Sequence, residues 1–164
     1  MLEIFSISSL TNVLDLSRNI LRGSLTKEVG MLKNIDWLDV SENHLCGEIT
    51  GTIGEYVSLE YLHLQENSFN GTIPSSLAAL KGLQYLDISR NQLYGPIPGV
   101  MENISGLEYL NMLEGEVPTN GVFGNATRVA LIGNYKLCGG ISQLHLPPYY
   151  VKRWTHTKKI IFPS

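Results

Sequence analysis

The chain repeats a short pattern of apolar and polar positions every 24 residues. Apolar residues separated by one position recur as Leu14 and Leu16, Leu38 and Val40, Leu62 and Leu64, and Leu86 and Ile88. Because successive side chains of a strand point to opposite faces, this alternation predicts a short strand that buries two side chains in each repeat. We therefore expect strands at residues 14–16, 38–40, 62–64, 86–88 and 110–112.

A polar position and a glycine follow each predicted strand at a fixed distance. The asparagines are Asn19, Asn43, Asn67 and Asn91, and the glycines four residues later are Gly23, Gly47, Gly71 and Gly95. An asparagine amide can bond to turn backbone that no strand satisfies, so we expect the four to stack as a structural ladder. Glycine suits a position with positive φ. Pro74 and Pro98 then interrupt any helix, which predicts an irregular return segment with short 3₁₀ or α turns.

A period of this length with this leucine spacing is typical of a leucine-rich-repeat solenoid. One coil cannot bury its own apolar edge, whereas stacked coils share a continuous core. The predicted fold class is α/β: a right-handed solenoid with a curved parallel sheet, an irregular or 3₁₀ convex side and about five coils of 24 residues. The repeats occupy residues 10–112, after a truncated N-terminal edge at 1–9.

Three stretches carry a family resemblance. "LEYLHLQENSFNGTIPSSLAALKG" and "LQYLDISRNQLYGPIPGVMENISG" resemble the plant-specific form of the repeat. The stretch "LEGEVPTNGVFGNATRVALIGNYKLCGG" resembles the end of the ectodomain in plant leucine-rich-repeat receptor-like kinases, in the subfamily that contains pattern-recognition receptors. The resemblance implies a glycoprotein that recognises a peptide or microbial molecule outside the plasma membrane. It also implies signalling in defence or development through a co-receptor kinase.

The C-terminal part departs from the repeat. The fifth repeat lacks four residues, including its ladder asparagine, so residues 113–148 are expected to form an incomplete last repeat and a cap. The resemblance implies a cysteine pair that closes the cap; Cys138 matches the first, but Tyr149 stands where the second is expected. Cys46 lies about four coils away, roughly 20 Å at the spacing of paired strands. Since a disulfide requires Cα atoms within about 7 Å, we expect no disulfide.

Charge and terminal segments limit the functional classes. The net charge is −3, and −7 for residues 1–151 without Lys152, Arg153, Lys158 and Lys159, so nucleic acid is not an expected partner. The basic segment 149–164 has three interpretations: a frayed end, a juxtamembrane stretch or a site for anionic lipid. The sequence shows no signal peptide, membrane span or kinase motif. We expect a non-enzymatic ectodomain fragment. A soluble decoy or an inhibitor of a microbial wall-degrading enzyme, and a non-functional truncated gene product, are alternatives.

Candidate binding residues lie at the outward positions of the predicted strands. One column runs through Trp37, Tyr61 and Tyr85, and the next positions contribute His63, Gln65 and Asp87. Aromatic side chains beside polar groups suit an extended peptide, although part of the column could serve only to pack neighbouring strands. His63 could also sense acidity. No catalytic set, metal site or cofactor site emerges. Glycosylation sequons begin at Asn70, Asn103 and Asn125.

Overall fold

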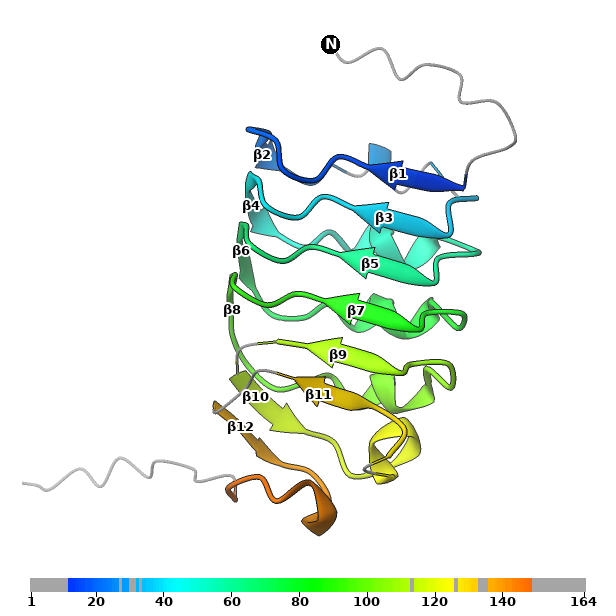
Figure 1. The fold of residues 1–164 in the computed structure, drawn as a ribbon, viewed down its shortest axis with the longest axis vertical. Coiled ribbons are helices and arrows are strands. Elements are labelled where there is room, and N and C mark those ends of the chain that lie inside the picture. The colour runs from blue at the N-terminus through cyan, green and yellow to red at the C-terminus, as the bar shows by residue number, and fades with distance from the viewer. Residues whose placement is uncertain are drawn as a thin grey trace, which may run out of the picture.

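The computed structural model describes residues 12–26, 28, 29, 32, 34–112, 114–125, 127–132 and 136–148. The predicted N-terminal edge at 1–9 and the basic segment at 149–164 lie outside these residues. The described chain forms a curved leucine-rich-repeat solenoid (Figure 1), as predicted. Its main sheet is parallel and follows the order β1-β3-β5-β7-β9-β11. The strands are β1 Val13–Asp15, β3 Trp37–Asp39, β5 Tyr61–His63, β7 Tyr85–Asp87, β9 Tyr109–Asn111 and β11 Ala130–Ile132.

Equivalent positions of successive coils are in register in this sheet. Leu14 pairs with Leu38, Leu38 with Leu62 and Leu62 with Leu86, each 24 residues apart. The strands begin one residue before the predicted segments, although the backbone pairing continues past their ends, where the Leu16 N–H donates to the Asp39 carbonyl at 2.7 Å. The difference is one of boundaries, which depend on how the ends of a ladder are assigned.

The sixth strand, β11, was not predicted. Ala130 pairs with Tyr109, 21 residues before it, so the fifth coil is shorter than the others. This coil also lacks the ladder asparagine and the glycine at the expected distance. Periodicity therefore could not find the next strand, although the backbone of β9 still offers a parallel edge on which it pairs.

A second parallel sheet follows the ladder turn, in the order β2-β4-β6-β8. Its strands are β2 Arg22–Ser24, β4 His44–Glu48, β6 Ser68–Gly71 and β8 Gln92–Leu93; β10 Glu114–Val117 and β12 Lys136–Gly139 form a separate pair. The sequence analysis did not predict this second sheet. These segments are short, polar and rich in glycine, so they show no apolar alternation. They pair because the ladder holds each coil in the same place as its neighbour.

The convex side carries short 3₁₀ helices, as predicted. They are η2 Gly51–Glu55, η3 Ser75–Ala79, η4 Gly99–Asn103, η5 Gly121–Gly124 and η6 Ser142–Leu144. Pro74 and Pro98 stand at the N-caps of η3 and η4. Proline is favourable there because its fixed φ and missing N–H suit a helix start and prevent extension backwards.

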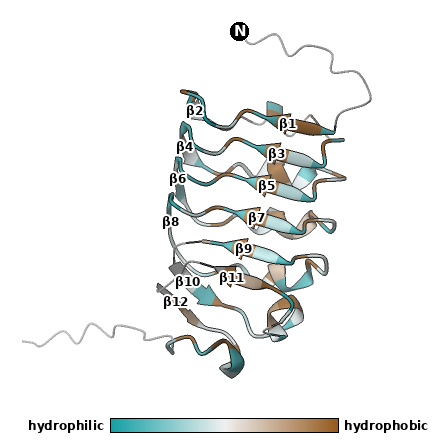
Figure 2. Cartoon of the chain, in the orientation of Figure 1, coloured by the Kyte–Doolittle hydropathy of each residue, from teal (hydrophilic) through white to brown (hydrophobic). Residues whose placement is uncertain are grey.

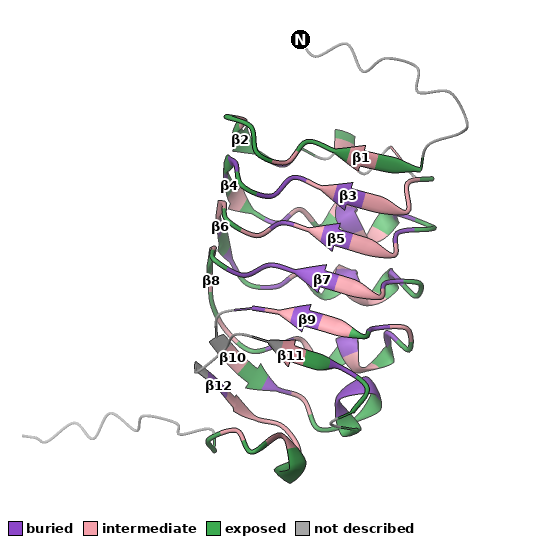
Figure 3. Ribbon diagram, viewed as in Figure 1, coloured by how far each residue is buried: buried purple, intermediate pink, exposed green. Residues whose placement is uncertain are grey.

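The core runs between the main sheet and the convex side. Leu38, Leu62, Leu86 and Leu110, at the centres of successive strands, are fully buried. Figure 3 shows this buried row through β3, β5, β7 and β9, whereas β1 at the edge is more exposed. Polar and apolar residues are mixed within every coil (Figure 2). Among the described residues, no helix has the length and apolar character to cross a membrane.

Candidate ligand-binding face

The ladder asparagines fix the turn that follows each strand. Asn43 Nδ2 donates to the carbonyls of Val40 and Ser41 in its own coil and of Leu16 in the preceding coil, at 2.9–3.1 Å. Its Oδ1 accepts from the Leu21 N–H at 3.0 Å. The structure places Asn67 and Asn91 in the same arrangement, whereas Asn19 bonds only within its own coil among the described residues. Each of the three inner asparagines thus joins two coils.

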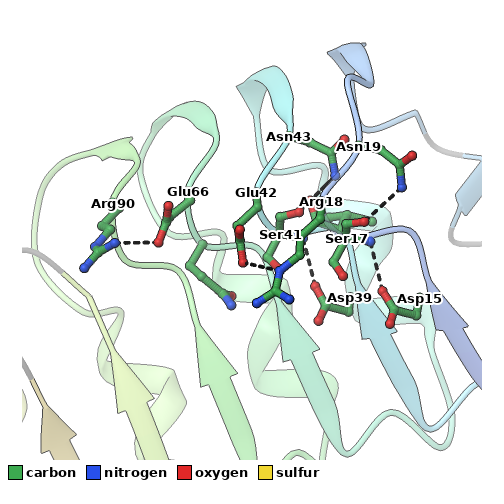
Figure 4. Close-up of polar contacts among 12 residues, drawn as sticks. Asp15, Ser17, Arg18, Asn19, Asp39, Ser41, Glu42, Asn43, Glu66 and Arg90 are labelled. Atoms are coloured by element: carbon green, nitrogen blue, oxygen red, sulfur yellow. Dashed lines mark hydrogen bonds and ion pairs between the residues drawn. The ribbon is translucent and has the colours of Figure 1, made fainter.

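The residue before each ladder asparagine adopts a left-handed backbone. Arg18, Glu42, Glu66 and Arg90 have φ between 51° and 56°. This conformation is uncommon for residues other than glycine and asparagine, and costs about 1 kcal/mol or more per residue. The ladder bonds on the following residue stabilise it. As a result, these four charged side chains form a row beside the sheet (Figure 4).

Three coils repeat a local Asp–Ser turn on the concave face. Asp15 accepts from the Ser17 N–H at 2.9 Å, and Asp39 from the Ser41 N–H at 2.9 Å (Figure 4). Hydrogen bonds from Ser17, chiefly through its hydroxyl, hold the pKa of Asp15 below its ordinary value. In the fourth coil, Asp87 accepts from both the N–H and the hydroxyl of Ser89, at 3.0 and 2.7 Å. The turn therefore holds each of these aspartate side chains against the backbone of its own coil.

The outward aromatic side chains form a stacked ridge across four coils. We call Trp37, Tyr61, His63, Tyr85 and Tyr109 the aromatic ridge. Trp37 stacks on Tyr61 and His63, with ring centroids 4.8 and 4.9 Å apart. His63 also stacks on Tyr85 at 4.6 Å, and Tyr85 on Tyr109 at 3.9 Å. The Tyr61 hydroxyl donates to Gln84 Oε1 at 3.4 Å, and burial raises the pKa of Tyr85. Each ring is thus held by its neighbours.

The third coil departs from the Asp–Ser pattern. His63 and Gln65 occupy the two positions that the first, second and fourth coils give to aspartate and serine. Among the described residues, His63 Nε2 and Gln65 Oε1 are buried atoms without a hydrogen-bond partner. Burial lowers the pKa of His63 below its ordinary value of 6.5, against the opposing effect of Asp39 and Asp87. The third coil therefore has two side-chain atoms free to form hydrogen bonds, whereas the aspartate and serine of the adjacent coils bond to each other.

The predicted site residues lie together in the structure. Trp37, Tyr61, His63 and Tyr85 belong to the aromatic ridge, Gln65 follows it in the third coil, and Asp87 lies next to His63 in the register of β5 and β7. Asp87 is only 6% exposed and accepts a bond from Asn111 Nδ2 at 3.1 Å. Its role within the described chain is therefore partly structural.

The structure also shows contacts that the sequence analysis missed. Arg18 pairs with Glu42 at 2.9 Å, and Arg90 pairs with Glu66 (Figure 4). Opposite charges at equivalent positions of adjacent repeats were a signal in the sequence, since such positions stack at one strand spacing. The mutual stacking of the ridge carried no comparable signal, because it depends on side-chain rotamers.

The sequons and cysteines lie away from the aromatic ridge. Asn70 lies on β6, Asn103 ends η4 and Asn125 follows η5; all three are exposed. Cys46 on β4 is exposed and free. Cys138 on β12 is also free, and its Sγ donates to the Gly115 carbonyl at 3.6 Å.

Comparisons with known proteins agree with this architecture. A family profile described as leucine rich repeat matches residues 57–113. A probable LRR receptor-like serine/threonine-protein kinase of Arabidopsis thaliana is 55% identical over 38 residues, which are 23% of this chain and 4% of the relative. The chain thus spans a small part of that protein.

Solved plant receptor ectodomains share the fold. The structure of a TDR receptor superposes with a TM-score of 0.68 at 31% identity, over 77% of this chain and 22% of that one. The ectodomain of the receptor kinase SOBIR1 from Arabidopsis thaliana gives 0.62 at 30% identity, over 78% of this chain and 76% of that one. The Arabidopsis receptor kinase HAESA, in complex with the peptide hormone IDA and the co-receptor SERK1, gives 0.64 at 26% identity, over 83% and 27%. The repeat pattern, the coil geometry and these similarities together show that the chain belongs to the leucine-rich-repeat family of plant receptor-kinase ectodomains.

Proposed function

We propose that this chain recognises an extended peptide on the concave face of its main sheet, as the ligand-recognition part of a plant receptor-like kinase ectodomain. The observation that carries the proposal is the aromatic ridge, which crosses four coils at the outward positions of the strands. Aromatic side chains contribute a large contact area at low cost in conformational entropy. Because the rings already pack on one another, their side chains lose little conformational entropy when a ligand binds.

The geometry of the ridge favours a peptide over a flat sugar ring. The stacked pairs have interplanar angles of 4–27°, so most ring faces are covered by neighbouring rings. Ring edges and hydroxyl groups are then the parts left for a ligand. The unpartnered atoms His63 Nε2 and Gln65 Oε1 lie in the same coil region. Both atoms are buried, so they bond to a peptide amide once their side chains rotate outward, and such bonds would fix the register of the peptide.

The HAESA structure supports the same setting, since that ectodomain is bound to a peptide hormone and a co-receptor. The present chain spans 27% of that one, so the whole receptor's ligand and partners are part of the proposal. We place this chain outside the cell, in a protein whose kinase is a separate domain. The concave face itself performs recognition and no chemistry.

A selection from a random peptide display library on the immobilised chain tests the proposal. Enriched peptides are synthesised, and their affinity is measured for the wild type, Tyr61→Ala and Lys81→Ala. Lys81 is exposed in the turn after η3, on the convex side, and provides the matched control. We expect Tyr61→Ala to weaken binding by about 5- to 150-fold, the scale of an aromatic anchor.

Trp37→Ala should act in the same direction, and circular dichroism should show that both variants keep the fold. Enriched peptides that bind Tyr61→Ala and Trp37→Ala as tightly as the wild type would contradict the proposal. The binding surface would then lie on the lateral turns or outside these coils.

A further inference from the structure

The two rows of residues beside the aromatic ridge carry mainly negative charge. The middle row of the strands carries carboxylates at three positions, and His63 and Asn111 at the other two. The row just before the strands carries carboxylates and Gln84, with no cation in the register of β3 to β9. The carboxylates of these two rows are Asp15, Asp39 and Asp87, and Asp36, Glu60 and Glu108.

Two arginines in the row that follows the strands are already paired. Arg18 and Arg90 form ion pairs with Glu42 and Glu66, which lie between them in the same row. Among the described residues, Asp39 accepts a hydrogen bond from the Ser41 backbone and has no ion pair. Arg18 also interacts electrostatically with Asp15 and Asp39. The carboxylates of the two rows still outnumber the two arginines of the adjacent row, so the concave face around the ridge is acidic.

Among the described residues, the terminal ring of the ridge, Trp37, is stacked by other rings on one side only. Both aromatic partners of Trp37, Tyr61 and His63, come from the third coil. On the side of the first coil the register neighbour of Trp37 is Val13, which is half-exposed, and no described ring stacks there. Asp15 and Asp39 pair in register two residues along the same strands. Tryptophan is the best side chain for a cation–π contact, and two carboxylates here lie within one strand spacing of each other.

We propose that the ligand of this face is a cationic extended peptide, with one arginine or lysine against Trp37 between Asp15 and Asp39 and a second basic side chain near Asp87. The inference rests on the proposed function and names the charge class of its peptide. Asp39 and Asp87 lie two coils apart, roughly 10 Å at the strand spacing. A peptide in the extended polyproline II conformation has three residues per turn and rises about 3.1 Å per residue, so side chains three positions apart share one face and lie about 9 Å apart. The basic residues should therefore stand three positions apart.

The first test reads the peptides selected from the display library. Enriched sequences that depend on Tyr61 should be basic, with arginine or lysine over-represented at positions three apart. Peptides that depend on Tyr61 but are neutral or acidic would overturn the charge class and leave the proposed function standing. Enriched peptides that do not depend on Tyr61 would contradict both.

The second test uses three fluorescein-labelled peptides of identical length and sequence, except at two positions three apart. These positions carry arginine, glutamine or glutamate in an otherwise uncharged sequence. Fluorescence anisotropy with the full chain at low salt should rank arginine above glutamine and glutamate. We expect an arginine advantage of about three- to tenfold that shrinks at high salt, because exposed ion pairs are weak and screened.

A matched pair of variants locates the effect. Asp39→Asn removes one charge and keeps an oxygen to accept from Ser41, while Glu55→Gln removes one charge on η2 at the convex side. Asp39→Asn should abolish most of the arginine advantage, and Glu55→Gln should preserve it. Equal losses in both variants would show general attraction to an acidic chain and overturn the proposal. Equal affinities of the three peptides, or no binding by any of them, would also overturn it.

Discussion

Replacing Asn67 by alanine is the sharpest test of how the coils are held together. Asn67 Nδ2 lies 2.9 Å from the Val40 carbonyl, 3.2 Å from that of Leu64 and 3.3 Å from that of Gln65. Its Oδ1 accepts from the Leu45 N–H at 3.0 Å. The substitution removes all four contacts and leaves the apolar core of the coil in place.

The loss of stability in Asn67→Ala depends on how many of these backbone groups keep another hydrogen-bond partner. The Leu64 carbonyl still accepts from Asn91 at 2.9 Å, and the Gln65 carbonyl from the Glu42 N–H at 3.0 Å. The Val40 carbonyl also still accepts from Asn43 Nδ2, at 3.1 Å. Among the described residues, the Leu45 N–H is the group that loses its partner, and Leu45 is buried. One orphaned backbone group in this part-buried site gives a loss of about 1–3 kcal/mol.

Urea denaturation followed by circular dichroism measures this loss, with Asn19→Ala as the control. Asn19 occupies the same repeat position but is exposed and bonds only to Leu16 and Ser17 carbonyls, which water can also reach. We expect its replacement to cost less than about 1 kcal/mol. Hydrogen exchange should accelerate at the Leu45 amide in Asn67→Ala. Equal costs at the two positions, or an unchanged Leu45 amide, would refute the ladder reasoning.

Three further predictions concern the ends, a glycine and pH. Hydrogen exchange should be faster in β1 than in β5, because Leu16 is 39% exposed while the equivalent Leu64 is fully buried; equal rates in the two strands would contradict this. Gly115→Ala should cost about 1–3 kcal/mol in urea denaturation, because its Cβ would lie 2.7 Å from the Gly95 carbonyl oxygen at φ +144°. Gly23→Ala, with nothing within 4 Å, should cost less. The pKa of His63 is lowered by burial, so protonation favours the unfolded chain; stability should fall as pH drops below the unfolded value of 6.5, and His63→Gln should remove that loss.

Much of the fold was accessible to sequence reasoning because it is built from a local repeat. The spacing of Leu38, Leu62 and Leu86 predicted parallel strands stacked in register, and the prolines predicted 3₁₀ helices on the convex side. Where the period failed, so did the prediction. The fifth coil lost its asparagine, and the strand Ala130–Ile132 after it was missed. The second sheet was missed because its residues pair through backbone alone.

Some features of the candidate site could be predicted from the sequence, and others could not. The outward positions of Trp37, Tyr61 and Tyr85 followed from alternation, since a side chain next to a buried leucine must point away from the core. His63 stacks between Trp37 and Tyr85, and its buried Nε2 has no hydrogen-bond partner within the described part of the chain. This arrangement depends on side chains from three coils. No local pattern encodes such a contact.

The sequence by itself determined the architecture, because a strict period imposes the same backbone path on every coil and stacking then follows from burial of the shared leucine rows. Tertiary structure decided which outward groups satisfy one another. In three coils the aspartate accepts a hydrogen bond from the serine two residues later. Two arginines form ion pairs with glutamates of the adjacent coils. Within the described chain, His63 and Gln65 of the third coil keep buried polar atoms without a hydrogen-bond partner. These contacts depend on distances of about 3–5 Å between side chains and backbone of adjacent coils, and the coils come that close only when the chain has folded and they have stacked.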